Sequence, residues 1–125
     1  MTTEIVVTSD MSARIDGPEI HPVYGTGALI AAIERICRGI IEPHLEDGED
    51  AVGARLEILH REPVPVGETV AITATVATVG PLTLVCEILV RHGGSNIARG
   101  SFEQRLVQLA DFRTQAEARR TAVSS

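Results

Sequence analysis

The chain has 125 residues, of which 44% are hydrophobic and 2% aromatic, and this size and composition predict a single globular domain, residues 1–125. Its 11 basic and 17 acidic side chains give a formal net charge of −6, which argues against nucleic acid or an anionic membrane surface as a partner. The first residues lack the basic and apolar regions of a secretory signal, and no apolar run is long enough to span a membrane. We therefore expect a cytoplasmic protein.

The two cysteines, Cys37 and Cys86, lie among apolar residues without the spacing of metal ligands. They could pair as a disulfide, but in a cytoplasmic protein we expect buried free thiols. No glycine-rich phosphate loop precedes a helical segment. The sequence therefore predicts neither a metal nor a nucleotide cofactor.

The first 50 residues contain one strong helical pattern. Residues 4–8 are mostly β-branched and predict a strand at the edge of the domain. Residues 9–25 carry several glycine and proline turn signals, so we expect the segment 8–25 to be a loop that serves as a lid. Residues 26–42 show helical apolar spacing with only a narrow polar stripe, which predicts a helix buried over most of its circumference, with Thr26 as its N-cap.

The second half of the chain has the patterns of long strands, predicted at residues 52–60, 68–79, 82–91 and 97–109. Alternation in the first of these places His60 on the apolar, inward face. The tail, residues 111–125, is expected to hold a short exposed helix at 111–120 and a frayed serine-rich end. Together these elements predict an α+β fold in which a five-stranded antiparallel sheet wraps one long helix.

Three polar side chains lie where burial would be costly: Thr26, Glu34 and His60. A carboxylate and an imidazole that converge on one pocket suit general-base or nucleophilic catalysis. Thr26 and Glu34 are eight residues apart, so an ideal helix separates them by about 12 Å along its axis. They would border one groove without touching.

Each of these residues also has a purely structural interpretation. Thr26 could be only an N-cap, and His60 could be a satisfied histidine at a strand end. Glu34 could pair with Arg38 at i,i+4 spacing. Two further positions also have alternative interpretations. Gly53 could mark a bulge, and Tyr24 could line a pocket or simply pack. The remaining histidines are expected at the surface: His21, His44 and His92.

Residues 23–107 resemble the hotdog-fold thioesterases, and most closely the fluoroacetyl-CoA thioesterase-like family. The motifs that carry the resemblance are Tyr24-Gly25-Thr26-Gly27, Ile33-Glu34, Leu45-Glu46-Asp47-Gly48-Glu49, Val52-Gly53, Leu59-His60 and Pro65-Val66-Gly67-Glu68-Thr69-Val70. The resemblance implies a hotdog fold and a homodimer in which two sheets join side by side, with acyl-CoA sites near the interface. It also implies that Thr26, Glu34 and His60 form the catalytic set.

In that family a glycine seven residues before the histidine positions the reacting groups, and Gly53 fills that place. Tyr24 and Gly27 are the further expected substrate contacts, and no cofactor is implied. Residues 9–25 depart from the family's aromatic lid, since Tyr24 is their only aromatic residue. We therefore predict hydrolysis of short-chain acyl-CoA thioesters without selectivity for fluoroacetyl-CoA. The alternative is a non-catalytic module that binds acyl-CoA or a small hydrophobic ligand.

Overall fold

The computed structural model describes the backbone of residues 1–124 and the side chains of residues 1–120. Its elements, in chain order, are β1 (Thr2–Val6), the 3₁₀ turn η1 (Ser9–Met11), β2 (Ser12–Arg14), β3 (Glu19–Tyr24), α1 (Thr26–Ile41), the 3₁₀ turn η2 (Glu42–His44), β4 (Glu49–His60), β5 (Thr69–Val79), β6 (Thr83–His92), β7 (Ser95–Gln108) and α2 (Leu109–Ser124).

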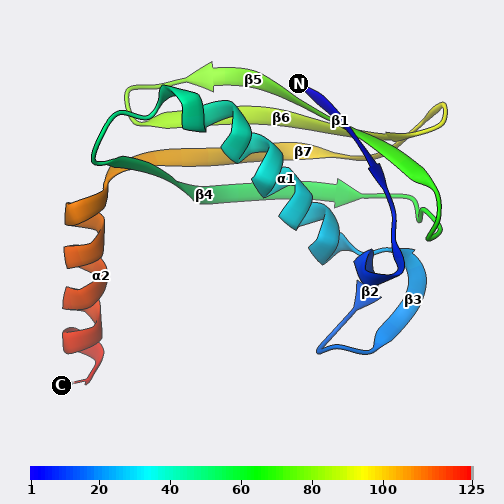
Figure 1. Cartoon of the computed structure of the whole chain (residues 1–125), viewed down its shortest axis with the longest axis horizontal. Coiled ribbons are helices and arrows are strands. Elements are labelled where there is room, and N and C mark those ends of the chain that lie inside the picture. Colours follow the sequence, from blue (N-terminus) through cyan, green and yellow to red (C-terminus); the bar gives the residue numbers. More distant parts are fainter. Residues whose placement is uncertain (125) are drawn as a thin grey trace.

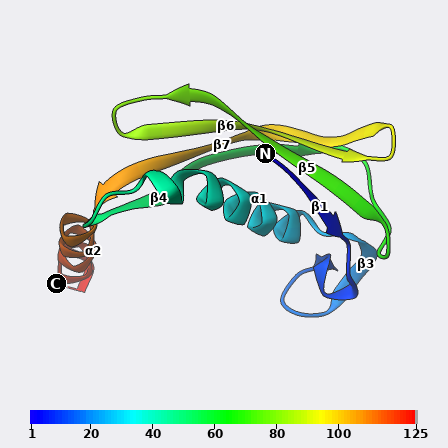
Figure 2. The ribbon, with the colours of Figure 1, turned by 45° about the horizontal axis from the view of Figure 1, so that its top comes forward.

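The predicted α+β architecture is confirmed. Five antiparallel strands form one sheet in the order β1-β5-β6-β7-β4, and α1 lies across its concave face (Figures 1 and 2). The boundaries of most strands differ from the predicted ones by one to three residues. Both β1 and β4 are edge strands, and β4 is 12 residues long. A long edge strand leaves a row of backbone groups without partners.

The expectation of a loop at residues 9–25 is wrong. This segment holds η1 and a small antiparallel sheet of β2 and β3. The two strands are short and pair with register shifts, and Asp16 and Gly17 between them have positive φ, so the sequence shows no alternating pattern. Tyr24 N–H donates to the Val64 carbonyl at 2.7 Å, which anchors the hairpin to the body of the domain.

Helix α1 buries one face only, so the expectation of burial around most of its circumference is wrong for a single chain. Six residues of this face are buried against the sheet: Leu29, Ala32, Ile33, Ile36, Cys37 and Ile41. The opposite face is exposed, and it includes Thr26, Gly27, Ala31, Glu34, Arg35 and Gly39. One sheet can cover only one side of a helix, which leaves the second side open.

The prediction of two buried free thiols is confirmed. Cys37 on α1 and Cys86 on β6 are both fully buried and unpaired by a disulfide. Burial, together with the neighbouring Cys86 thiol, raises the pKa of Cys37 to about 12. Both thiols face the interior between helix and sheet.

The tail forms a helix, as predicted, but α2 begins earlier and runs further than expected. Residues 110–120 are exposed. The frayed end that we expected falls at residues 121–125, outside the side chains that the structure describes. No helix in the part of the chain described by the structure has the length and apolar character needed to cross a membrane.

The contact between β4 and β7 depends on a glycine. Gly100 lies opposite Ile58, and a Cβ atom at Gly100 would overlap the carbonyl oxygen of Glu57. We expect Gly100→Ala to lower the free energy of unfolding by about 1–3 kcal/mol, because backbone atoms must move to admit the methyl group. Gly94→Ala is the matched control, since a Cβ there meets nothing within 4 Å. Equal denaturation midpoints for the two variants would contradict this interpretation.

Candidate active site

The end of β4 meets the start of α1. Thr26 is the first residue of the helix and His60 is the last residue of the strand, and the Thr26 Oγ1 atom lies 2.9 Å from His60 Nδ1. The N-cap is Gly25, which has extended backbone angles and makes no side-chain cap. The prediction of Thr26 as N-cap is therefore wrong, because its hydroxyl is used in a tertiary contact with His60.

The residue before the helix must be a glycine. A Cβ atom at Gly25 would lie 2.9 Å from the Ser12 carbonyl oxygen, and Gly25 N–H donates to the Met11 carbonyl at 2.8 Å. This close approach seats the helix start against β2. This role of Gly25, and the position of Ser12 beside it, could not be predicted because the sequence did not indicate β2.

The surroundings of His60 favour a neutral imidazole. Burial lowers its pKa, and the nearby backbone of Glu62 opposes that shift to a smaller extent. The His60 Nε2 atom is buried and has no hydrogen-bond partner among the described residues. Since the pKa lies below the ordinary 6.5, His60 is mainly uncharged at pH 7. A neutral imidazole can accept a proton.

Tyr24 supports the imidazole from the side. Its ring is 2% exposed and meets the His60 ring edge to face, with centroids 6.5 Å apart and an interplanar angle of 73°. The hydroxyl is buried and has no hydrogen-bond partner among the described residues, and burial raises its pKa. Tyr24 therefore both lines the pocket and packs, and in this structure it acts through its ring.

A cavity of about 270 Å³ opens at this point, lined by Ala13, Val23, Tyr24, Thr26, His60, Arg61, Glu62 and Pro63. The first helical hydrogen bond runs from Leu29 N–H to the Gly25 carbonyl, at 3.0 Å. The preceding N–H groups, of Thr26, Gly27 and Ala28, have no acceptor within the helix. Gly27 is exposed, and a Cβ there would meet nothing within 4 Å. The helix start can thus approach an anionic oxygen closely.

Glu34 lies apart from this pair within one chain. It is exposed and forms neither a hydrogen bond nor an ion pair with the described residues. The alternative of a Glu34–Arg38 pair is wrong, because Arg38 binds Glu42 at 3.0 Å and Asp50 at 2.7 Å. Arg38 Nη1 also donates to the Ala51 carbonyl at 3.1 Å.

Gly53 is also distant from His60 in one chain, since seven strand residues span about 23 Å. The register shift between Gly53 and Arg55 confirms the bulge that the sequence left open. A Cβ atom at Gly53 would lie 3.0 Å from Cζ of Phe102, so the glycine also makes room for that ring. The structure therefore brings Tyr24, Thr26 and His60 together, with Gly27 next to them, but not Glu34 or Gly53.

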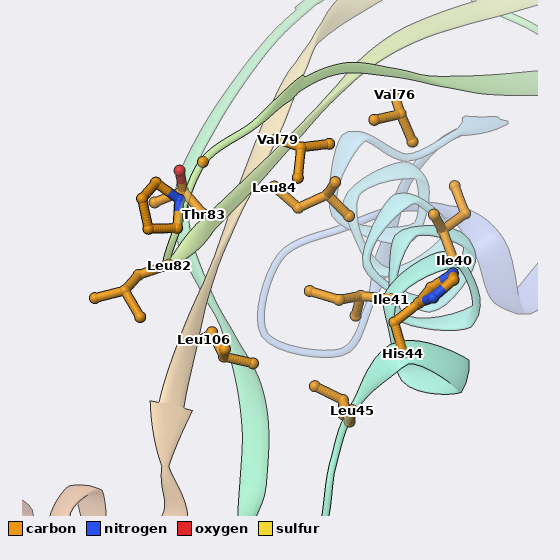
Figure 3. Close-up of a pocket in the computed structure, with 12 residues that line it drawn as sticks. Ile40, Ile41, His44, Leu45, Val76, Val79, Leu82, Thr83, Leu84 and Leu106 are labelled. Atoms are coloured by element: carbon orange, nitrogen blue, oxygen red, sulfur yellow. The ribbon is translucent and has the colours of Figure 1, made fainter.

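A second cavity, of about 410 Å³, lies at the other end of α1 (Figure 3). Its lining is mainly aliphatic: Ile40, Ile41, His44, Leu45, Val76, Val79, Gly80, Pro81, Leu82, Thr83, Leu84 and Leu106. None of the candidate residues contributes to it. Among the described residues, no group of three or more His, Cys, Asp or Glu side chains is arranged to hold a metal ion.

Comparisons with known proteins identify relatives of this chain. The model of the family "FlK: Fluoroacetyl-CoA-specific thioesterase" matches residues 7–110. The fluoroacetyl-CoA thioesterase of Streptantibioticus cattleyicolor is 29% identical over 94 residues, which are 75% of this chain and 68% of that protein.

Solved structures confirm the hotdog fold. A Thermus thermophilus protein of the thioesterase superfamily superposes with a TM-score of 0.88 at 26% identity, covering 98% of this chain and 91% of that one. A point mutant of the fluoroacetyl-CoA-specific thioesterase FlK, in complex with fluoroacetate and CoA, gives 0.83 at 24% identity, covering 95% and 98%. A hot-dog-like protein from Thermanaerovibrio acidaminovorans gives 0.86 at 20% identity, covering 95% and 88%.

The role of the Tyr24 ring can be separated from that of its hydroxyl. We expect Tyr24→Phe to leave the free energy of unfolding unchanged or to raise it by up to about 1 kcal/mol, because the hydroxyl it removes is buried without a partner among the described residues. Tyr24→Ala should cost about 3–5 kcal/mol and shift the imidazole resonances of His60 in NMR spectra. A large loss of stability in Tyr24→Phe would show that the hydroxyl has a partner after all.

Proposed function

We propose that this chain cleaves short-chain acyl-CoA thioesters in the cytoplasm. The chain belongs to the FlK family of fluoroacetyl-CoA-specific thioesterases and is an acyl-CoA thioesterase-like hydrolase. Thr26, Glu34 and His60 carry the reaction, without a metal or cofactor. The observation that carries the proposal is the 2.9 Å contact of Thr26 with a neutral His60, beside the open N-terminus of α1.

The working unit is a homodimer joined along β4. This strand is 12 residues long and lies at the edge of the sheet, so a second β4 can extend the sheet by antiparallel pairing. When that pairing is centred between Leu56 and Glu57, His60 lies opposite the partner's Gly53. A glycine opposite the imidazole leaves room for a substrate, which gives the seven-residue spacing a physical reason.

The same symmetry brings Glu34 to the site. Thr26 is held at the His60 end of β4, and Arg38 is held at Asp50 and Ala51, so α1 runs antiparallel to β4. Glu34 lies one turn before Arg38 and therefore near the level of Gly53. The partner's Glu34 then reaches the Thr26–His60 pair together with the partner's Gly53. This placement explains why Glu34 is exposed and has no partner among the described residues of its own chain.

The chemistry follows from the groups that meet there. The thioester carbonyl oxygen sits at the N-terminus of α1, where free N–H groups, among them that of Gly27, stabilise the negative charge that develops on it. Glu34 either attacks the carbonyl carbon or removes a proton from the attacking water. The C–S bond then breaks and CoA leaves as its thiolate, which takes up a proton. When Glu34 is the nucleophile, the acyl group stays on its carboxylate as an anhydride, and water then hydrolyses this anhydride to the free acid and restores Glu34. His60 assists this proton movement, and Thr26 orients the reacting groups.

The size of the pocket favours short acyl groups. The cavity beside Thr26 and His60 has a volume of about 270 Å³, and its walls are partly polar. The aliphatic cavity lies at the far end of α1, a helix of 16 residues that is about 24 Å long. The two cavities share no lining residue, so we expect no continuous apolar path along which a long acyl chain could reach from the first to the second. Hydrolysis of palmitoyl-CoA in preference to acetyl-CoA or propionyl-CoA would contradict this part of the proposal.

We expect Glu34→Gln to lower the rate of acyl-CoA hydrolysis by at least about 10²-fold while leaving the melting temperature unchanged, because the variant keeps the volume and removes the charge. His60→Ala should show a similar defect. The double variant should lose less than the product of the two defects, since the residues act as a unit. The measurement is steady-state release of CoA thiol from a panel of short acyl-CoA substrates.

Glu87→Gln is the matched control, because Glu87 is an exposed glutamate on β6, away from α1. If Glu34→Gln retained as much activity as this control, the carboxylate would have no part in the mechanism. If the wild-type protein bound the whole panel without releasing thiol, the alternative of a non-catalytic binding module would replace the proposal.

The dimer has its own test. A chain of 13.3 kDa should scatter light as a particle of twice that mass at micromolar concentration, because pairing two β4 edges removes unpaired backbone groups from both. Amide hydrogens of β4 should also exchange slowly along both edges of the strand. A stable monomer, or rapid exchange at alternate residues of β4, would exclude this interface.

A further inference from the structure

Helix α2 leaves the domain with little support from its own chain. Leu109 N–H donates to the Gly48 carbonyl at 2.8 Å, and Phe112 lies beside Leu82 and Leu106 near the end of β7. Beyond Phe112 the described side chains are exposed and mostly polar. An isolated polar helix of this length is only marginally stable in water. A binding partner would stabilise its extended form.

The direction of α2 points to where that partner lies. Figures 1 and 2 both show α2 extending past β4, on the side of the sheet opposite β5. Arg113 is near enough to Asp50, at the start of β4, to help lower the pKa of that carboxyl, although the Ala51 N–H and Arg38 contribute more. The helix thus stands beside the edge at which the proposed dimer joins, at the end of β4 away from His60.

Two-fold symmetry transfers α2 to the other subunit's site. An antiparallel pair of β4 strands has its axis perpendicular to the sheet, near the middle of the strand, and this axis exchanges the two ends of β4. The α2 helix of one subunit is therefore carried toward the partner's Thr26 and the partner's His60.

The side chains of α2 suit a polyanion better than an apolar surface. Residues 113–120 include three of the chain's arginines, although the whole chain has a net charge of −6. Arg113 and Arg120 are seven residues apart, so they share one face of the helix, about 10 Å apart along its axis. Glu117 lies between them, 3.6 Å from Arg120, in an exposed ion pair that is worth little in water. At the pocket itself, Arg61 is the arginine of the lining.

We propose that Arg113 and Arg120 of one subunit bind the phosphate groups of the acyl-CoA whose thioester is held at the partner's Thr26 and the partner's His60. The proposal rests on the proposed function and on its dimer. CoA carries a diphosphate and a ribose phosphate, for which arginine is the preferred side chain. Residues 113–120 carry a net positive charge, whereas the rest of the domain is acidic overall.

The first experiment compares two substrates. An acyl-CoA and the same acyl thioester of N-acetylcysteamine share the reacting group, but only the first has phosphates. We expect the double variant Arg113→Gln/Arg120→Gln to raise KM for the acyl-CoA by about tenfold or more and to weaken its dependence on salt. KM for the N-acetylcysteamine thioester should not change. The control is Arg91→Gln/Arg99→Gln, which removes two exposed arginines from β6 and β7.

The second experiment tests whether α2 acts across the dimer. Chains with His60→Ala are mixed with Arg113→Gln/Arg120→Gln chains, so that the hybrid dimer has one intact His60, on the chain with the altered α2. If α2 serves the partner's site, the hybrid has the wild-type KM for acyl-CoA. If α2 serves its own site, or if the double variant has no effect, the proposal is wrong.

The outcomes separate this proposal from the proposed function. A wild-type protein that hydrolyses both substrates while the double variant matches its control overturns only the role of α2. A wild-type protein that hydrolyses neither substrate overturns the thioesterase function. A double variant that loses activity equally on both substrates shows damage to the fold and contradicts phosphate binding.

Discussion

Polar contacts tie α1 to β4 at both of its ends. At its start Thr26 meets His60 at 2.9 Å, and near its end Arg38 meets Asp50 at 2.7 Å and the Ala51 carbonyl at 3.1 Å. These contacts are largely exposed and add little to the free energy of unfolding, which comes from the apolar face packed on the sheet. Their effect is on direction, because they set the helix antiparallel to the strand. The open helix start, the neutral imidazole and the outward Glu34 all follow from that setting.

The edge of the sheet links stability to function. A 12-residue edge strand such as β4, paired with β7 on one side only, is an aggregation risk for a monomer, and the exposed face of α1 carries the small residues Ala31 and Gly39. In the proposed dimer one pairing covers the edge and also brings together the two halves of the candidate catalytic set. Selection for a closed edge and selection for a complete site would then act on the same residues.

Periodicity predicted the elements that a single chain determines. The helical spacing from Thr26 and the alternation that ends at His60 gave the helix, the strand and the inward direction of the imidazole. Both cysteines were predicted as buried thiols because their neighbours are apolar. Hydrophobic patterning reports local burial, and these features are locally encoded. The sequence also predicted a five-stranded antiparallel sheet, but not the order of the strands within it.

Contacts between segments distant in sequence were less predictable. Thr26 has the residue type of an N-cap, but its hydroxyl has a partner 34 positions away. Glu34 has the ideal i,i+4 spacing to pair with Arg38. Arg38 instead binds Glu42, Asp50 and the Ala51 carbonyl, and the last two lie beyond the turn that follows the helix. The hairpin of β2 and β3 left no alternating pattern because its pairing is irregular. Gly25 was recognised as part of a motif, but its need for close approach depends on that unpredicted hairpin.

The burial of both cysteines affects whether the enzyme can react with the thiol that it releases. Each turnover of the proposed reaction releases CoA, a thiol that cells also hold in disulfide form, and thiol–disulfide exchange requires an accessible thiolate. Cys37 is fully buried with a pKa of about 12, and Cys86 is fully buried beside it with its pKa raised as well. The native protein therefore offers no thiolate for attack on a CoA disulfide. We therefore expect that the CoA released by the reaction does not modify the enzyme through mixed disulfides.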